Sequence, residues 1–105
     1  MFIANLPIYK KLTRKRSRDF AAHLARLIPA QSKVLDFGCG NMYTSQELLK
    51  ISPTLDIMGI DVIKDQNLDE QFLSDERLNF TLLKTKELPF PDNHFDVSFA
   101  LTVMH

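Results

Sequence analysis

The chemistry of this chain centres on two acidic residues, each close to the end of a short, largely apolar segment. Asp36 is followed closely by Gly38 and Gly40, and Asp61 follows the segment 55–60. Glycines let the backbone take a positive φ and approach a ligand more closely than a side chain would permit. In dinucleotide-binding folds, an acid at the tip of the second strand accepts hydrogen bonds from the ribose hydroxyls. The pattern therefore indicates a site for a nucleotide-type cofactor.

Helices and strands must alternate to bring these residues together. We expect strands over residues 34–37, 55–60, 78–84 and 95 to about 103, and helices over 44–51 and 65–77. This alternation predicts an α/β fold with a parallel sheet and right-handed crossovers. A further amphipathic helix is expected before the first strand, and its predicted cap, inward-facing side chains and end are Ser17, Phe20, Leu24, Leu27, Ile28 and Pro29.

Three motifs in order resemble those of the class I S-adenosylmethionine-dependent methyltransferases of the small-molecule type. They are Asp-Phe-Gly-Cys-Gly at 36–40, Met-Gly-Ile-Asp at 58–61 and Leu-Pro-Phe-Pro-Asp-Asn-His-Phe-Asp-Val at 88–97. The resemblance covers residues 33–105 and concerns the N-terminal, cofactor-binding half of that family. It implies a Rossmann-like parallel sheet with helices on both faces, incomplete at about four strands in the order 3-2-1-4.

The resemblance also implies roles for individual residues around S-adenosylmethionine. The glycine turn, with Cys39 between its glycines, would approach the methionine moiety, and Asp36 would orient the amino group of that moiety. Asp61 would bind the ribose, whereas two apolar residues would enclose the adenine. The expected cofactor-binding residues are Asp36, Gly38, Cys39, Gly40, Asp61, Val62 and Leu88.

Two positions depart from the family pattern. Met42 stands where the family pattern has a third glycine, a position at which many members also have another residue. Lys84 occupies the place of an acid that accepts a hydrogen bond from the adenine amino group, and an ammonium can only donate. The Thr85 hydroxyl or a backbone carbonyl is the expected substitute acceptor.

No catalytic residue is assigned, because a family member's general base typically comes from segments beyond the fourth strand. His105 is the one candidate weighed, and the alternative of a surface histidine is favoured. His23, His94 and His105 show no metal-ligand spacing, so no metal is expected. Cys39 is interpreted as a packing residue.

Two other functions were weighed against methyl transfer. A nicotinamide-dependent oxidoreductase would carry a third glycine at position 43, where this chain has Tyr43. A noncatalytic cofactor-binding or interaction module remains an alternative. At 105 residues the chain is shorter than a complete fold of this family, so a partial domain is expected at 33–105, preceded by a basic segment and helix at 1–32. Self-association through an exposed fourth strand is also considered.

Composition narrows the classes further. Hydrophobic residues at 45% and charged residues at 25% are ordinary globular values. No apolar run is long enough to span a bilayer, and the single cysteine excludes an internal disulfide, so a cytoplasmic location is expected. Residues 1–26 carry seven basic residues against one acidic residue. Nucleic acid binding is considered but not favoured, since no aromatic residue interrupts 10–18. A small-molecule methyl acceptor is expected instead.

Overall fold

The computed structural model describes residues 7–66, 68 and 76–100, with side chains from residue 14 onward. Its elements, in chain order, are α1 (Pro7–Ala25), β1 (Lys33–Phe37), α2 (Tyr43–Ile51), β2 (Asp56–Asp61), β3 (Leu78–Leu82) and β4 (Val97–Ala100). The helix expected over 65–77 and the end of the fourth strand, with His105, lie largely outside the described residues. The remaining expected strands and the helix after the glycine turn are present, with ends displaced by one or two residues.

The four strands form one parallel sheet in the order β3-β2-β1-β4, which confirms the predicted α/β class, strand direction and strand order. In the register of the central pair, Asp36 lies opposite Gly59 and Phe37 opposite Ile60. Parallel strands end at a common edge. Both acid-bearing strand ends are therefore neighbours in space.

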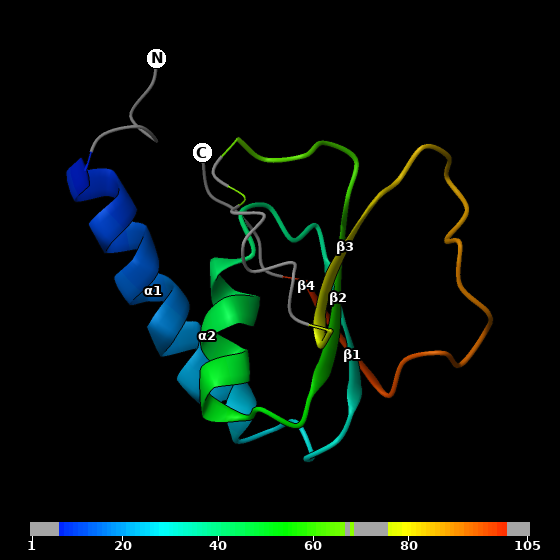
Figure 1. The fold of residues 1–105 in the computed structure, drawn as a ribbon, viewed down its shortest axis with the longest axis horizontal. Coiled ribbons are helices and arrows are strands. Elements are labelled where there is room, and N and C mark those ends of the chain that lie inside the picture. Colours follow the sequence, from blue (N-terminus) through cyan, green and yellow to red (C-terminus); the bar gives the residue numbers. More distant parts are fainter. Residues whose placement is uncertain (1–6, 67, 69–75, 101–105) are drawn as a thin grey trace.

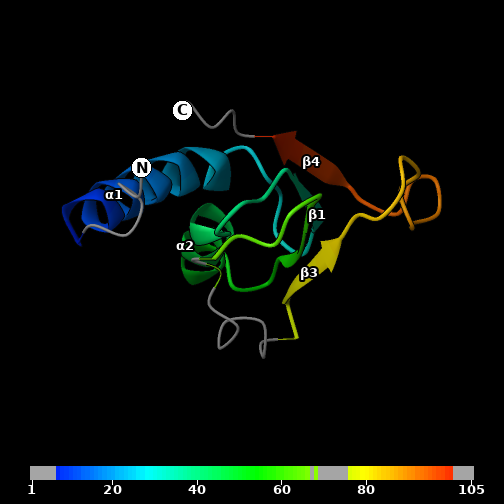
Figure 2. The same cartoon turned by 90° about the horizontal axis from the view of Figure 1, so that it is seen from above.

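Both described helices lie side by side on one face of the sheet (Figures 1 and 2). They run in the same direction, and the turn from β1 into α2 lies at the carboxyl edge of the strands (Figure 1). Helices were predicted on both faces of the sheet. Among the described residues, no helix covers the opposite face. The glycine turn thus lies where ligands bind in open α/β sheets.

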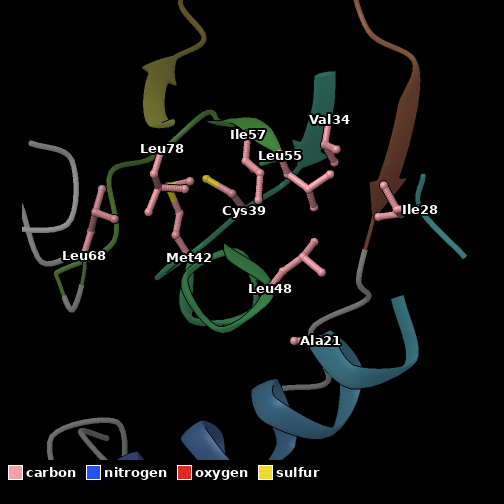
Figure 3. Close-up of a cluster of buried hydrophobic side chains, with 10 residues drawn as sticks. All are labelled: Ala21, Ile28, Val34, Cys39, Met42, Leu48, Leu55, Ile57, Leu68 and Leu78. Atoms are coloured by element: carbon pink, nitrogen blue, oxygen red, sulfur yellow. The ribbon is translucent and has the colours of Figure 1, made fainter. Parts of the chain in front are cut away.

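The hydrophobic core fills the space between the sheet and the helices (Figure 3). Side chains from β1, β2 and α2 meet there, and the fully buried ones include Val34, Ile57 and Leu48. Burying such a side chain stabilises the fold by about 1.5–3 kcal/mol relative to exposure. Because Cys39 and Met42 belong to the same cluster, the turn itself is part of the core.

The prediction for the first helix was right for Ile28, which is buried, and for Leu24, which packs against the core, but wrong in the start of the helix and in the other half of its inward-facing residues. Ser17 does not cap a helix, because α1 begins at Pro7 and Ser17 lies inside it with 7% of its surface exposed. Phe20 and Leu27 are exposed at 44% and 68%. The buried face instead carries Ser17 and Ala21, four residues apart. Small side chains at this spacing allow a close approach of two helices, which apolar periodicity alone does not reveal.

Candidate functional site

In the turn after β1 the two glycines leave open space beside their backbone, although Cys39 between them is buried. Gly38 and Gly40 have φ values of 69° and 54°, in the left-handed region that glycine adopts without a steric penalty. A Cβ atom added at either glycine would meet no other atom within 4 Å. The glycines are therefore not required by packing against the protein, and the space beside them is available to a ligand.

Hydrogen bonds attach this turn to the end of β2. The backbone N–H groups of Gly38 and Cys39 both donate to the carbonyl of Ile60, at 2.8 and 3.0 Å. The N–H of Gly40 donates to Oδ2 of Asp61 at 3.0 Å. The two motifs, separated in sequence, thus form one rigid unit.

Asp61 also accepts a hydrogen bond at its second oxygen. The N–H of Val62 donates to Oδ1 at 2.7 Å. An ionised carboxylate has about four acceptor positions, so these two bonds leave capacity for further donors. The side chain can accordingly hold the turn and receive two ligand hydroxyls at the same time.

Asp36 is a buried carboxylate with a perturbed pKa. Only 3% of its surface is exposed, and the Ser45 hydroxyl donates to its Oδ2 at 2.7 Å. Burial raises the pKa of Asp36 to about 6, the Ser45 hydrogen bond opposes that rise, and the charge of Asp61 adds to it. A buried carboxylate is costly unless a positive or hydrogen-bonding partner compensates it. The environment of Asp36 therefore favours a cationic ligand group.

Two residues before α2 shape its start: Met42, noted above at the place of a third glycine, and Asn41, which the sequence prediction did not include. Met42 has a φ of 61°, so it adopts the conformation that a glycine would supply, at a cost of roughly 1–2 kcal/mol. Asn41 Oδ1 accepts a hydrogen bond from the N–H of Tyr43 at 2.9 Å and so satisfies one of the free donors of the first turn. An asparagine two residues before a helix is a recognisable signal for this contact.

Met42 fills the space beside the glycine of the second motif. A Cβ atom added to Gly59 would collide with Met42 Cε, and it would lie 2.8 Å from Met42 Sδ and 2.9 Å from Cys39 Sγ. A side chain at position 59 would therefore force the Met42 or Cys39 side chain to move, whereas one at either glycine of the turn would not meet such a neighbour. Met42, which stands in place of the third glycine, thus packs against Gly59 of the second motif.

Cys39 is a buried free thiol, as the packing interpretation requires. Burial raises its pKa well above the ordinary range, and the negative charges of Asp36 and Asp61 raise it further. A thiol in this environment stays protonated, and a protonated thiol is a poor nucleophile. This environment disfavours a nucleophilic role and agrees with the interpretation of Cys39 as a packing residue.

The two residues expected around the adenine lie at the surface. Val62 and Leu88 are exposed at 67% and 45%; Val62 directly follows β2, and Leu88 lies in the connection between β3 and β4. Lys84 is exposed, and the Thr85 hydroxyl donates to the Glu87 carbonyl at 3.3 Å. The hydroxyl keeps its acceptor lone pairs in this contact.

His94 lies in a small aromatic cluster in the loop before β4. His94 stacks on Phe90 at 5.8 Å between ring centroids and meets Phe95 edge to face at 4.8 Å. Within the described ranges, no group of three histidine, cysteine, aspartate or glutamate side chains could hold a metal ion.

Comparisons with known proteins agree with this arrangement. Residues 35–105 match the model of the methyltransferase domain family. The chain is 33% identical over 91 residues to 27-O-demethylrifamycin SV methyltransferase of Amycolatopsis mediterranei (strain S699), covering 78% of this chain and 32% of that protein. It is 33% identical over 75 residues to tRNA U34 carboxymethyltransferase of Nautilia profundicola (strain ATCC BAA-1463 / DSM 18972 / AmH), covering 69% of this chain and 25% of that protein. The chain thus spans a third or less of these relatives.

Solved structures show the same fold. A putative sarcosine dimethylglycine methyltransferase from Galdieria sulphuraria superposes with a TM-score of 0.64 at 19% identity, over 81% of this chain and 35% of that one. Coclaurine N-methyltransferase, solved with N-methylheliamine and SAH, gives a TM-score of 0.61 at 14% identity, over 83% and 26% of the respective chains. The family match over two thirds of the sequence, together with this fold, shows that the chain belongs to the methyltransferase domain family.

Proposed function

We propose that this chain forms the S-adenosylmethionine-binding half of a methyltransferase that acts on a small-molecule acceptor. The observation that carries the proposal is the hydrogen bond from the Gly40 N–H to Asp61 Oδ2, because it joins the glycine turn to the expected ribose-binding acid. The activity and acceptor of the whole protein are part of this proposal, because the chain spans a third or less of its curated relatives.

The residues present fit the chemical groups of the cofactor. Asp61 has spare acceptor positions for two ribose hydroxyls. The raised pKa of Asp36 reflects a carboxylate without a cationic partner, and an α-amino group would supply one. The open space beside Gly38 and Gly40 admits the methionine chain against bare backbone.

These residues would act by positioning. When bound, the cofactor supplies an activated methyl group on a sulfonium sulfur, so the protein must mainly hold donor and acceptor in line and exclude water. Asp36 would orient the amino end, the turn around Cys39 would hold the intervening chain, and Asp61 would fix the ribose. Val62 and Leu88 would cover the adenine and lose their exposure to water on binding. In this scheme neither the two carboxylates, nor the glycine turn, nor the two apolar residues take part in proton transfer during the reaction.

A small-molecule acceptor is preferred to a nucleic acid. One curated relative is named for a rifamycin derivative and another for a tRNA, so the names alone do not decide between them. The described basic residues on α1 include Lys15, which pairs with Asp19 at 3.9 Å, and the exposed Arg16 and Arg18. No aromatic residue is interleaved among the basic residues at positions 14–18. We therefore propose that the basic face is solvated.

We also propose a cytoplasmic location. The support is a free, buried cysteine, which is typical of a reducing compartment. No helix in the described ranges has the length and apolarity needed to cross a membrane.

Calorimetry with SAH and with NAD tests the proposed function. We expect SAH to bind in preference to NAD, and Asp61→Ala to weaken SAH binding by about 1.5–3 kcal/mol, the value of hydrogen bonds to a charged acceptor. Asp56→Ala, which alters an exposed acid at the amino end of β2 and outside the three motifs, serves as the control. A preference for NAD would refute the proposal. Binding of SAH without methyl transfer by the whole protein would favour the noncatalytic cofactor-binding module instead.

A further inference from the structure

The described part of α1 contacts α2 through one cationic side chain, Arg14. Its guanidinium carbon lies 3.9 Å from the centroid of the Tyr43 ring, a distance typical of a cation–π interaction. Its Nη1 donates to Gln46 Oε1 at 3.1 Å and lies 3.9 Å from Glu47 Oε1. We refer to Arg14, Tyr43, Gln46 and Glu47 as the helix clasp.

The clasp acts on the first turns of α2. Positions 43, 46 and 47 share one helical face by their spacing, so a single guanidinium contacts them all. Tyr43, Gln46 and Glu47 are all buried, and the Arg14 side chain is only 30% exposed. Such a contact is better protected from solvent screening than an ordinary surface ion pair.

The clasp continues directly into the cofactor turn. Tyr43 is the first residue of α2, its N–H is held by Asn41, and the intervening Met42 is locked in the core at 1% exposure. A displacement of Tyr43 would therefore be transmitted along a short, fully constrained segment to Gly40. The position of α1 against α2 is thus linked to the backbone that approaches the cofactor.

Stabilising α2 is a weak reason for placing the Arg14 guanidinium beside the first turn of that helix. A cation near the first turn of a helix opposes the positive end of the helix dipole, and Glu47 offsets that effect only one turn further on. The Nε2 atom of Gln46 is also buried without a hydrogen-bond partner among the described residues. A contact selected only to stabilise the helix pair would avoid both features.

We propose that Arg14 is a positioning residue for the cofactor turn and acts through the ring of Tyr43. This inference rests on the proposed function, because it concerns the same site. It gives the helix that precedes the methyltransferase match a direct role in cofactor affinity.

Calorimetry with SAH on the whole protein tests this role. We expect Arg14→Met, which keeps much of the aliphatic stem, to weaken SAH binding by roughly tenfold, as expected for loss of a cation–π contact and a charge-assisted hydrogen bond. Arg16→Met is the matched control, since Arg16 is exposed on the same helix. It should bind SAH as the parent does.

Conservative variants separate positioning from folding. Arg14→Lys keeps the cation and Tyr43→Phe keeps the ring, so both should stay within about threefold of the parent affinity, whereas Tyr43→Leu should match Arg14→Met. All measurements are made below the thermal transition of each variant, as recorded by circular dichroism. A purely structural role would lower the melting temperatures and leave the affinities equal.

Each outcome decides between the hypotheses. Parent-like SAH affinity in Arg14→Met, or an equal loss in Arg16→Met, would overturn the inference and leave the proposed function intact. Failure of the unmodified protein to bind SAH would refute the proposed function, and with it this role of Arg14.

Discussion

Replacing Asp36 by asparagine should remove the pH dependence of cofactor binding in weakly acidic solution. The carboxyl is 3% exposed, and burial raises its pKa from 3.8 to about 6. Only the ionised form can pair with the ammonium group of the ligand. Binding by the parent protein should therefore be roughly tenfold weaker at about pH 5 than at about pH 8, because some nine-tenths of Asp36 is protonated at the lower pH.

The same shift predicts a proton release that can be measured. At about pH 6 roughly half of Asp36 is protonated, so SAH binding should release about half a proton per site. Calorimetry in two buffers of different ionisation enthalpy measures this number. Asp36→Asn should bind more weakly, with a flat pH profile and no release from this site.

Stability of the unliganded protein gives an independent check. The folded pKa of Asp36 lies above the unfolded value, so the unfolded chain gives up this proton first as the pH rises. The contribution of Asp36 to stability is therefore fully present below about pH 4 and is lost as the pH rises through about 6, a total of about 3 kcal/mol. Asp36→Asn should lack this component in denaturant titrations. Persistence of the same pH dependence in Asp36→Asn would refute the assignment of both effects to this carboxyl.

Three further predictions follow from packing, edge exposure and charge. Gly59→Ala should destabilise the fold by about 1–3 kcal/mol in urea titration, because the added carbon meets Met42 and Cys39. Met42→Ala in the same chain should recover part of this loss, and a double variant whose destabilisation equals the sum of the two single ones would contradict the contact. Because β4 pairs only with β1 among the described strands, the chain should associate at high concentration through the free edge of β4. Ser98→Lys should shift size-exclusion profiles toward the monomer, and an unchanged profile would exclude association through this edge. A mixed RNA should not bind tightly in a shift assay, and salt-sensitive binding that Arg16→Glu abolishes would contradict the solvated basic face.

Local sequence signals were sufficient for most of the strands and for the order of elements. A glycine turn after an apolar segment needs particular residues at adjacent positions, so the signal is contained in a few consecutive letters, as at Gly38 and Gly40. The strand order came from the resemblance to a known family rather than from periodicity. The sheet confirms it, with Asp36 and Asp61 both at the carboxyl edge.

The first helix shows where local reasoning failed. Its apolar periodicity suggested that Phe20 and Leu27 turn inward, but both are exposed. The structure buries Ser17 and Ala21, because close packing against α2 favours small side chains over large ones at the contact. Apolar periodicity did identify Leu24 and Ile28, which face the core, whereas the burial of Ser17 and Ala21 depends on the neighbouring helix.

The sequence by itself determined which groups the site contains: two carboxylates, a bare glycine backbone and the order in which they occur. Tertiary structure alone decided their chemical state. The pKa of Asp36 depends on burial and on the Ser45 hydroxyl, which reaches it from a different element. Likewise, the need for Gly59 arises from the Met42 side chain packed across it. Such effects depend on distances between residues remote in the chain, and folding alone sets those distances.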